Sequence, residues 1–443
     1  MSDRILLDSD PREAGRCTGA LVAGRLRDLV SRMWAQSETA HCGPTQLDER
    51  GERFRAFVGR IAPEWLDEAE AVGAAAGVNP SDIFVLNALP GGFWSPPAGN
   101  CTSCLVVGSA SATTDTLLHK NRDLLDSIQT FHVARLAGGG QVFASRDVGN
   151  IGIGHFHSDR PLAGANNTGS PLVEGELRDC GLTCCHLLRL VAERAFSCDE
   201  AVAVLEDALA REVAGGSGGT RGMIFLFADP DRGVLVEMTS RRLAVREVCD
   251  DTLVRSNHFL LDEMLPFAQP PTHNTLRRAE RARELLAASG QPNLADLQRL
   301  ARDHADGPDS ICCDDAEHFW MTVSACTHVV RPQATDPLAH TRAMMGHPHN
   351  TLAIPVPRAI DGLPAACVSG ELHELARALY RAKGCGAHMA ALQETHERAM
   401  AMELASVGAA ARFGPEETLR EALGDFVARA VERVRTALEG LLP

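Results

Sequence analysis

A cysteine stands where a loop rich in proline and glycine gives way to an apolar run typical of a β-strand. The loop covers residues 90–98, the run covers residues 101–107, and Asn100 precedes the cysteine, Cys101. A thiol at such a junction can attack the peptide bond in front of it. If the Asn100–Cys101 bond breaks, Cys101 becomes an N-terminal residue with a thiol nucleophile and an α-amine base. These groups titrate at about 8.5 and about 8, which suits catalysis near neutral pH.

The composition limits the class of protein. The chain has 443 residues, of which 45% are hydrophobic and 23% are charged, as in soluble globular proteins. Its formal net charge of −15 argues against a nucleic-acid partner, because phosphate binding needs a basic surface. No apolar run reaches the ~18 residues of a membrane span, and residues 1–10 lack the apolar core of a signal peptide. We therefore expect a cytoplasmic protein without a membrane partner, and the 14 scattered cysteines fit a reducing compartment.

The hydrophobic pattern divides the chain into three segments. Residues 1–100 are predicted to form a helical leader, because their apolar residues recur at helical spacing. Residues 101–368 are predicted to form the core, since β-rich runs in hairpin pairs alternate there with helical pairs. Residues 369–443 are predicted to form a helical C-terminal extension. The clearest hairpins are expected at 104–107 with 116–119, 131–136 with 141–144, and 223–228 with 234–238, and the clearest core helices at 182–193, 198–211, 275–288 and 294–304. This alternation indicates a layered α/β architecture with antiparallel sheets.

Several motifs occur in the order and spacing of a known family. They are residues 68–78 and 82–88, Asn100-Cys101-Thr102-Ser103, His119-Lys120-Asn121-Arg122-Asp123, the loop Gly164-Ala165-Asn166-Asn167-Thr168-Gly169, residues 225–229, and Ser256-Asn257-His258-Phe259. Over roughly residues 60–355 the chain resembles the acyl-coenzyme A:6-aminopenicillanic-acid acyltransferase family. Its members are self-processing N-terminal-cysteine hydrolases and acyltransferases related to bile-salt hydrolases and penicillin V acylases. The resemblance implies an α/β (α+β) fold, the four-layer αββα sandwich of N-terminal-nucleophile hydrolases, with Cys101 at the start of a central strand.

The resemblance also implies catalytic roles. Cys101 would be the nucleophile. Asp123 would orient the freed α-amine and stabilise its protonated form. The amides of Asn166 and Asn257 would donate hydrogen bonds to the oxyanion of the tetrahedral intermediate.

Four further residues are placed with the substrate and the supporting groups. The positive charge of Arg122 would lower the pKa of the thiol, and Asn121 precedes it in the same motif. Either Arg277 or Arg278 would contact a substrate carboxylate or the developing charge, and the register leaves both open. Two positions depart from the family's pattern, because Asn100 stands where glycine is usual and Arg122 where an aromatic residue is frequent. The first departure leaves cleavage between Asn100 and Cys101 open.

These residues predict a self-processing amidohydrolase or acyltransferase, made as a zymogen. It would cleave an amide bond of a small-molecule or peptide-like substrate through a thioester, and pass the acyl group to water or to an amine. No metal or cofactor is expected, and acyl-coenzyme A is open as a co-substrate. After cleavage the leader and the core would remain together as a heterodimer, and a homo-oligomer is open. The alternative is an uncleaved relative that keeps the fold and has a binding role in a biosynthetic pathway.

Other clusters receive structural interpretations. Residues 180–186 and 312–315 combine cysteine with histidine or aspartate, but the adjacent cysteines of the first cluster fall on an apolar helix. The sequence has no two Cys-x-x-Cys knuckles that could pair around one metal ion, so zinc is not expected. The histidine pairs within residues 155–157 and 347–349 are expected in exposed loops. Residues 215–222 are expected to form a flexible glycine-rich loop, because they precede a strand and lack the Gly-Lys-Ser/Thr ending of a phosphate-binding loop.

Overall fold

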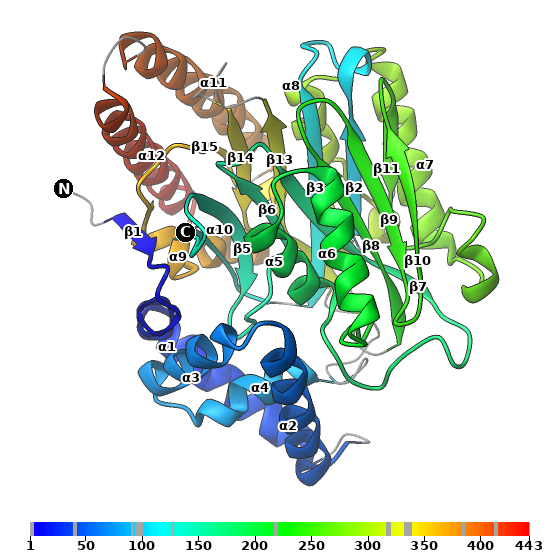
Figure 1. The fold of residues 1–443 in the computed structure, drawn as a ribbon. Helices are drawn as coiled ribbons and strands as arrows, with labels where there is room; N and C mark the ends of the chain where they lie inside the picture. The colour runs from blue at the N-terminus through cyan, green and yellow to red at the C-terminus, as the bar shows by residue number, and fades with distance from the viewer. Residues whose placement is uncertain are drawn as a thin grey trace.

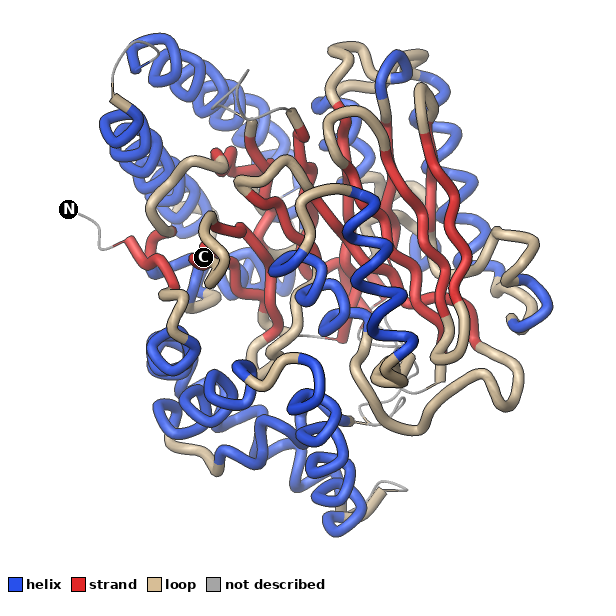
Figure 2. The backbone as a smooth tube through the Cα atoms, viewed as in Figure 1, coloured by secondary structure: helices blue, strands red, loops and turns tan. Residues whose placement is uncertain are grey.

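Two β-sheets lie at the centre of the molecule (Figures 1 and 2). The computed structural model describes residues 4–38, 42–89, 93, 101–125, 127–216, 220–315, 320–331, 339–382, 386–411 and 415–442. Within these residues one sheet has nine strands, in the order β10 (Leu243–Val248), β9 (Gly233–Met238), β8 (Arg221–Ala228), β7 (Ala163–Pro171), β6 (His155–Ser158), β5 (Gln141–Asp147), β4 (Gln129–Arg135), β1 (Arg4–Leu7) and β16 (Leu363–Pro364). The other, of seven described strands, has the order β11 (Thr252–Arg255), β2 (Cys101–Val106), β3 (Thr116–Leu125), β13 (Trp320–Val330), β14 (His340–Met345) and β15 (Ala353–Pro357), with β12 (Asp314–Asp315) paired to β13.

Hairpin pairing explains most of this strand order. Strands β2 and β3, β4 and β5, and β8 and β9 follow each other in the chain and pair antiparallel, as the sequence predicts. In the first pair Cys101 lies opposite Arg122 and Ser103 lies opposite Lys120. Strands β3 and β13, and β2 and β11, pair although they are distant in the chain, and β1 of the leader pairs with β4 in parallel. The leader is therefore not wholly helical.

Apolar side chains fill the space between the sheets. Leu105 and Leu118 of the seven-stranded sheet share one cluster with Ala165 and Leu226 of the nine-stranded sheet, and all four are fully buried. Burying one leucine side chain stabilises the fold by about 1.5–3 kcal/mol. The outer faces carry helices on opposite sides: α5 (Cys184–Arg194) and α6 (Cys198–Ala210) cover the nine-stranded sheet, and α7 (His273–Ala288) and α8 (Leu294–Ala301) cover the seven-stranded sheet. These four layers confirm the predicted αββα sandwich.

The leader helices pack against one end of the sandwich (Figure 1). They are α1 (Pro11–Ser37), α2 (Pro44–Ile61), α3 (Glu64–Ala76) and α4 (Pro80–Ala88). Their apolar residues belong to the same cluster as α5 and the outer face of the nine-stranded sheet; Trp65, for example, is fully buried there. The leader and the core thus share one hydrophobic core.

A buried carboxylate links the leader to the core. Glu68 of α3 pairs with Arg146 of β5, with 2.6 Å between Oε1 and Nη1, and also with Arg189 of α5. All three side chains are at most 9% exposed. Burial opposes the charge of Glu68, but Arg146 and Arg189 together lower its pKa from 4.5 to about 2. The leader is therefore held by charge pairing as well as by apolar contact.

Replacing Glu68 by glutamine is expected to destabilise the protein by about 3 kcal/mol at pH 7, because buried Arg146 and Arg189 lose their pairing with Glu68, although Arg189 keeps Glu193 at 2.7 Å. Since folding lowers the pKa of Glu68, its contribution is present above pH 4.5 and is lost as the pH falls towards 2. Urea unfolding of both proteins at pH 7 and pH 3 measures the difference, which should shrink at the lower pH. Glu70→Gln, at an exposed ion pair with Arg55, is the control and should cost less than about 1 kcal/mol. A difference independent of pH would contradict this role of Glu68.

The C-terminal helices cover the far edge of the sandwich. After the short α9 (Ala365–Val368) come α10 (Glu371–Ala382), α11 (Gly386–Ala411) and α12 (Glu416–Glu439). Phe426 of α12 shares an apolar cluster with Phe131 of the nine-stranded sheet and Ile354 of the seven-stranded sheet. Helices α11 and α12 contact β15, at the edge opposite β11. They shield an edge strand that would otherwise expose unpaired backbone groups.

Candidate active site

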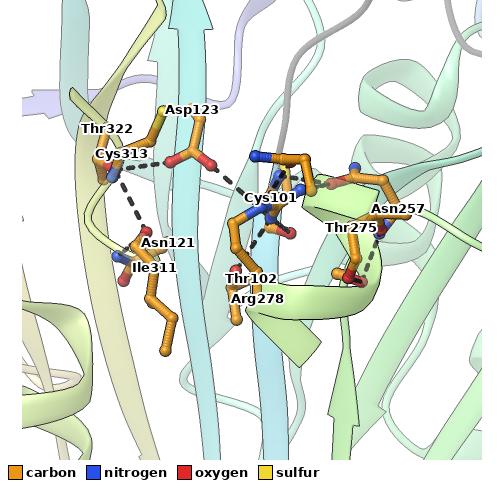
Figure 3. A network of polar contacts seen from close by, with 12 residues as sticks. Cys101, Thr102, Asn121, Asp123, Asn257, Thr275, Arg278, Ile311, Cys313 and Thr322 are labelled. Carbon is orange, nitrogen blue, oxygen red and sulfur yellow. Dashed lines mark hydrogen bonds and ion pairs between the residues drawn. The ribbon is translucent and has the colours of Figure 1, made fainter. Parts of the chain in front are cut away.

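The backbone of Cys101 is held by two side chains (Figure 3). Strand β2 begins at Cys101, which is 6% exposed. Its backbone N–H donates to Asn257 Oδ1 at 2.8 Å, and its carbonyl oxygen accepts from Arg278 Nη1 at 2.5 Å. Asn257 follows β11 and Arg278 lies on α7, 156 and 177 residues later in the chain. The start of β2 is therefore fixed by distant elements that meet only in the folded protein.

The guanidinium of Arg278 is the centre of this network. The side chain is fully buried, and it also donates to Thr102 Oγ1 at 3.0 Å and to Asn257 Oδ1 at 2.8 Å. Its Nη1 lies 3.9 Å from Asp123 Oδ2. One rigid, planar cation thus ties α7 to β2, β3 and the segment after β11. Of the two arginines that the sequence leaves open, the structure brings Arg278 to Cys101.

Asp123 is a buried carboxylate with one oxygen unsatisfied. Oδ1 accepts from the Thr322 hydroxyl at 2.7 Å. Among the described residues, no donor lies within hydrogen-bond distance of Oδ2. Burial raises the pKa of Asp123 above its usual value, while Arg278, Thr322 and Lys120 act to lower it. A buried, unsatisfied carboxylate oxygen is costly, and a cationic donor brought next to it would be stabilised.

Asn257 uses its side-chain oxygen, not its amide N–H, toward Cys101. Nδ2 donates to Thr168 O at 2.7 Å, and the backbone N–H of Asn257 donates to Thr275 Oγ1 at 2.8 Å. In this conformation Asn257 therefore positions the Cys101 nitrogen, which differs from the oxyanion donor that the sequence motif suggests. Its role in stabilising an oxyanion stays a prediction.

A buried ion pair supports the segment that carries Asn257. Arg255 donates to Glu237 Oε1 at 2.7 Å, and both side chains are fully buried. Glu237 also accepts from the backbone N–H groups of Leu260 at 2.7 Å and Leu261 at 3.0 Å. The chain on either side of Asn257 is thus anchored to β9.

Replacing Asn257 by alanine is expected to slow chain cleavage or turnover at least about tenfold, because the Cys101 nitrogen loses its acceptor. The measurement is the rate at which intact chain disappears, followed by mass spectrometry, together with turnover. Asn257→Asp keeps an acceptor oxygen and should retain more of the rate. Asn274→Ala should have the smallest effect, since Asn274 accepts from Arg278 Nε at 3.0 Å and donates to Pro308 O and Asp309 Oδ1, and among the described contacts it does not bond to Cys101. Wild-type rates for Asn257→Ala would remove this residue from the site.

The two asparagines of residues 164–169 face opposite sides of a strand. The segment lies on β7 and is not a loop. Asn166 points towards the start of α5, and its Nδ2 donates to Ile153 O, before β6, at 3.1 Å and to Cys184 O, in α5, at 3.5 Å. Asn167 points between the sheets, where its Oδ1 accepts from the Ser103 hydroxyl and from Lys120 Nζ, each at 2.7 Å. Successive side chains of a strand alternate between its faces, so only one of the pair can point between the sheets.

Arg122 lies directly across the strand pair from Cys101. Its guanidinium donates to both carboxylate oxygens of Asp147, at 2.6 and 2.5 Å, and to Gln129 Oε1 at 2.6 Å. Burial opposes its charge, but Asp147 and the nearby thiols of Cys185 and Cys101 raise the pKa of Arg122 above its usual value. Arg122 is therefore a fixed positive charge beside the Cys101 thiol.

The guanidinium of Arg122 also lies close to a second thiol, that of Cys185. Arg122 Nη2 lies 3.8 Å from Cys185 Sγ, and Asn166 Nδ2 lies 3.9 Å from the same sulfur. A hydrogen bond from Cys184 and the charge of Arg122 outweigh burial and lower the pKa of Cys185 to about 7. By contrast, burial raises the pKa of Cys104, on the other face of β2, to about 12. Cys185 is thus a thiol prone to ionise next to the proposed nucleophile.

Two predicted residues lie away from Cys101. Arg277 pairs with Glu280, Glu284 and Asp306, at 3.0, 3.1 and 3.0 Å, on the more exposed side of α7. Asn121 faces α8, and its Nδ2 donates to Ala301 O at 2.9 Å. The assignment of these two residues to the substrate site stays a prediction. Asn100, the residue before the predicted cleavage, lies outside the described residues.

Several residues of the site carry no motif signal of their own. They are Asp147, Cys185, Arg221, Thr275 and Thr322; Lys120 lies within the motif of residues 119–123 but receives no role there. Lys120 alternates with Asn121 along β3, so strand periodicity indicates that it shares a face with Arg122. The others come from five different elements and give no local signal. Their partners are set by tertiary contact.

Three of the four histidines in these pairs are buried, whereas the sequence predicts exposed loops. His155 and His157 lie on β6 and are at most 1% exposed, so their placement in an exposed loop is wrong. His347 is also buried, whereas His349 is exposed. In the described ranges, no group of three or more His, Cys, Asp or Glu side chains is arranged to hold a metal ion. None of the helices described above is both long and apolar enough to cross a bilayer.

The solved structures that are similar to this chain include two variants of one bile acid hydrolase and one acid amidase. A variant of conjugated bile acid hydrolase from Clostridium perfringens is 12% identical, with a TM-score of 0.36, over 55% of this chain and 89% of that one. A second variant of the same enzyme is 10% identical, with a TM-score of 0.34, over 54% and 88% of the two chains. A Caenorhabditis elegans ortholog of N-acylethanolamine-hydrolyzing acid amidase is 13% identical, with a TM-score of 0.36, over 52% and 92%. No curated protein sequence matches the chain.

A family model matches the middle of the chain, over residues 171–334. The matched stretch contains Asn257 and Arg278, and it begins after Cys101, Asp123 and Asn166. It is shorter than the stretch over which the sequence motifs indicate a resemblance. The model is described as acyl-coenzyme A:6-aminopenicillanic acid acyl-transferase, so the resemblance to that family is confirmed.

Proposed function

We propose that this chain is a self-processing N-terminal-cysteine enzyme that hydrolyses an amide bond or transfers its acyl group. Cleavage between Asn100 and Cys101 frees the α-amine of Cys101. The amine takes the proton of the thiol, and the thiolate attacks the carbonyl carbon of the substrate amide. The tetrahedral oxyanion collapses to a thioester, and the leaving amine takes the proton from the α-ammonium. Water or a second amine then attacks the thioester and releases the thiol.

One observation carries this proposal. The Cys101 nitrogen, which would become the α-amine, donates to Asn257 Oδ1 at 2.8 Å in a buried network. A base must be held in a fixed orientation next to its nucleophile, and here both groups belong to one residue. The hydrogen bond supports a nitrogen that is already oriented before cleavage.

The environment of Asp123 supports the same chemistry. Its buried Oδ2 has no donor among the described residues. Among the described residues, the cation within ion-pair distance of this oxygen is Arg278, whose Nη1 lies 3.9 Å away. A protonated α-amine released nearby would supply a hydrogen bond and a compensating charge. Asp123 is therefore proposed to stabilise the ammonium form that protonates the leaving group.

The family match over residues 171–334 supports the reaction class, amide hydrolysis or acyl transfer. The choice between the two depends on which acceptor reaches the thioester, and acyl-coenzyme A is retained as a proposed co-substrate. The shared core and the buried Glu68 pairs support a leader that stays bound after cleavage. The processed enzyme is then a heterodimer of residues 1–100 and 101–443.

The intact mass of the purified protein under denaturing conditions tests the proposal. Two species, residues 1–100 and 101–443, are the expected result. Amides and acyl donors would then be screened for turnover, with trapping of the thioester by hydroxylamine as the chemical signature. A single uncut chain without turnover would overturn the proposal and favour the alternative, an uncleaved binding protein with this fold.

A further inference from the structure

A β-bulge in β13 lies directly opposite Asp123. Strands β13 and β3 pair antiparallel, and their register shifts by one residue between Thr322 and Ser324. Ser324 lies opposite Arg122, so a regular ladder would place Val323 opposite the next residue of β3. The extra residue instead places Thr322 opposite Asp123. Bulges re-aim side chains and are frequent next to active sites. Here the bulge puts a hydroxyl group, in place of an apolar side chain, opposite the carboxylate.

The neighbours of the Thr322 hydroxyl fix the direction in which it donates. The backbone N–H of Cys313 donates to Thr322 Oγ1 at 2.8 Å, so the oxygen is the acceptor there and keeps its hydrogen for another partner. Asp123 Oδ1 lies 2.7 Å away, whereas Ile311 O lies 3.5 Å away, beyond the ordinary distance for a hydroxyl donor. Thr322 and Asp123 are both fully buried. The hydroxyl therefore donates to Asp123, which favours the ionised carboxylate.

This hydrogen bond also sets the orientation of the carboxylate. Figure 3 shows Asp123 between Thr322 on one side and Arg278 and Cys101 on the other. Asp123 Oδ2 lies 3.9 Å from Arg278 Nη1, and the same Nη1 donates to Cys101 O at 2.5 Å. Because Oδ1 is bound to β13, rotation of the carboxylate is restricted. Oδ2 is therefore directed towards the start of β2.

The charge of Asp123 depends on groups from several elements. Charged and titratable groups near it come from β2, β3, α7 and the segment before β12, and they are Cys101, Lys120, Arg278, Cys312 and Cys313. Burial raises the pKa of Asp123, whereas Arg278, Thr322 and Lys120 act to lower it. Burial, and to a lesser extent the charge of Asp123, raises the pKa of the Cys312 thiol, so this thiol stays neutral. Thr322 is the uncharged member of the three stabilising groups, and replacing it leaves every formal charge in place.

We propose that Thr322 is a positioning residue whose hydroxyl holds Asp123 ionised, with Oδ2 directed towards the nitrogen of Cys101. This rests on the proposed function, in which Asp123 stabilises the protonated α-amine that cleavage releases. An ionised carboxylate attracts that ammonium, and a protonated carboxyl group does not. Without the hydroxyl, the charged form of Asp123 loses a donor and takes up a proton at higher pH. Turnover should then require a higher pH.

The pKa of Asp123 tests the role of Thr322 without any turnover. It is measured by NMR of isotope-labelled aspartate Cγ in full-length Cys101→Ala protein, with Asp123→Asn identifying the signal. Thr322→Val should raise the pKa by at least about one unit, because a hydrogen bond to a charged group is lost. Thr322→Ser keeps the hydroxyl and should stay within about half a unit. Thr327→Val removes a buried hydroxyl of β13 that contacts His119 Nδ1 at 2.8 Å, and should leave the pKa of Asp123 unchanged.

The pH profile of turnover tests the same role in the processed enzyme. In Thr322→Val the acid limb of kcat/KM should move to higher pH by at least about one unit, and in Thr322→Ser it should return to the wild-type position. A merely structural residue would lower the rate at every pH and leave the limb in place. Should Thr322→Val fail to fold, Thr322→Cys replaces it in both experiments, because a thiol of similar size is only a weak donor.

The outcomes separate the two proposals. An unchanged pKa of Asp123 in Thr322→Val or its replacement Thr322→Cys, or an acid limb that does not move, would overturn the role of Thr322. Wild-type protein that remains uncut and turns over no amide would overturn the proposed function. The titration in Cys101→Ala protein would still decide whether Thr322 keeps Asp123 ionised.

Discussion

Cys101→Ala should abolish both chain cleavage and turnover, with a loss in rate of at least about a thousandfold. The substitution removes the sulfur that would attack the Asn100 carbonyl and then the substrate. The fold should survive, because alanine fits a buried strand position and the backbone contacts of Cys101 to Asn257 and Arg278 need no side chain. Denaturing mass spectrometry and the turnover assay read the two effects separately.

Two other thiols give controls for this prediction. Cys104 lies on the same strand but faces the helices α7 and α8, so Cys104→Ala should process and turn over like the wild type. Cys185 lies in the same positive field as Cys101. Activity that survives in Cys101→Ala but disappears in Cys101→Ala/Cys185→Ala would move the nucleophile to Cys185 and refute the assignment.

Arg278→Met should unfold more easily by roughly 3–5 kcal/mol and should fail to process. The fully buried guanidinium holds the Cys101 carbonyl, Thr102 and Asn257. Without it, the carboxylate of Asp123 is left buried and uncompensated, so it must take up a proton or disturb its surroundings. Urea unfolding followed by circular dichroism measures the first effect, and intact mass measures the second.

The neighbouring arginine supplies a matched control. Arg277→Met removes from the same helix an arginine side chain that is 25% exposed, and should cost less than about 1 kcal/mol without affecting cleavage. In the double variant Arg278→Met/Asp123→Asn, the buried charge is gone, so part of the stability should return while processing stays blocked. Normal cleavage in Arg278→Met would show that this network does not position Cys101.

The stability of the protein at acidic pH depends on two other buried groups, the imidazoles of His119 and His328. Burial lowers the pKa of His119 to about 4 and that of His328 to about 3. Because these imidazoles are neutral in the folded protein but bind protons near pH 6.5 when unfolded, stability should fall as the pH drops below about 6.5. The loss from Glu68 follows at lower pH, between 4.5 and 2.

The local hydrophobic pattern of the sequence was enough to predict the hairpins and the core helices. The runs at 223–228 and 234–238 alternate strongly and flank a turn-forming segment, so β8 and β9 were predictable from sequence. The helix at 371–382 has its apolar residues on one face and was predictable for the same reason. Strands β1, β6 and β7 were not, because they are short or rich in small and polar residues and are stabilised by their neighbours in the sheet.

The sequence by itself determined the candidate nucleophile, the order of the motifs and the layered fold, because these depend on residue type and on local periodicity. Only the tertiary structure decided between Arg277 and Arg278, since the two are adjacent on α7 and the packing of that helix against β2 buries just one of them. It also placed Asn166 and Asn167 on opposite faces of β7. It placed Arg221 in contact with Asn257, whose side chain accepts from the Cys101 nitrogen. Those contacts join residues far apart in the chain, and no local pattern records which side chain will meet which.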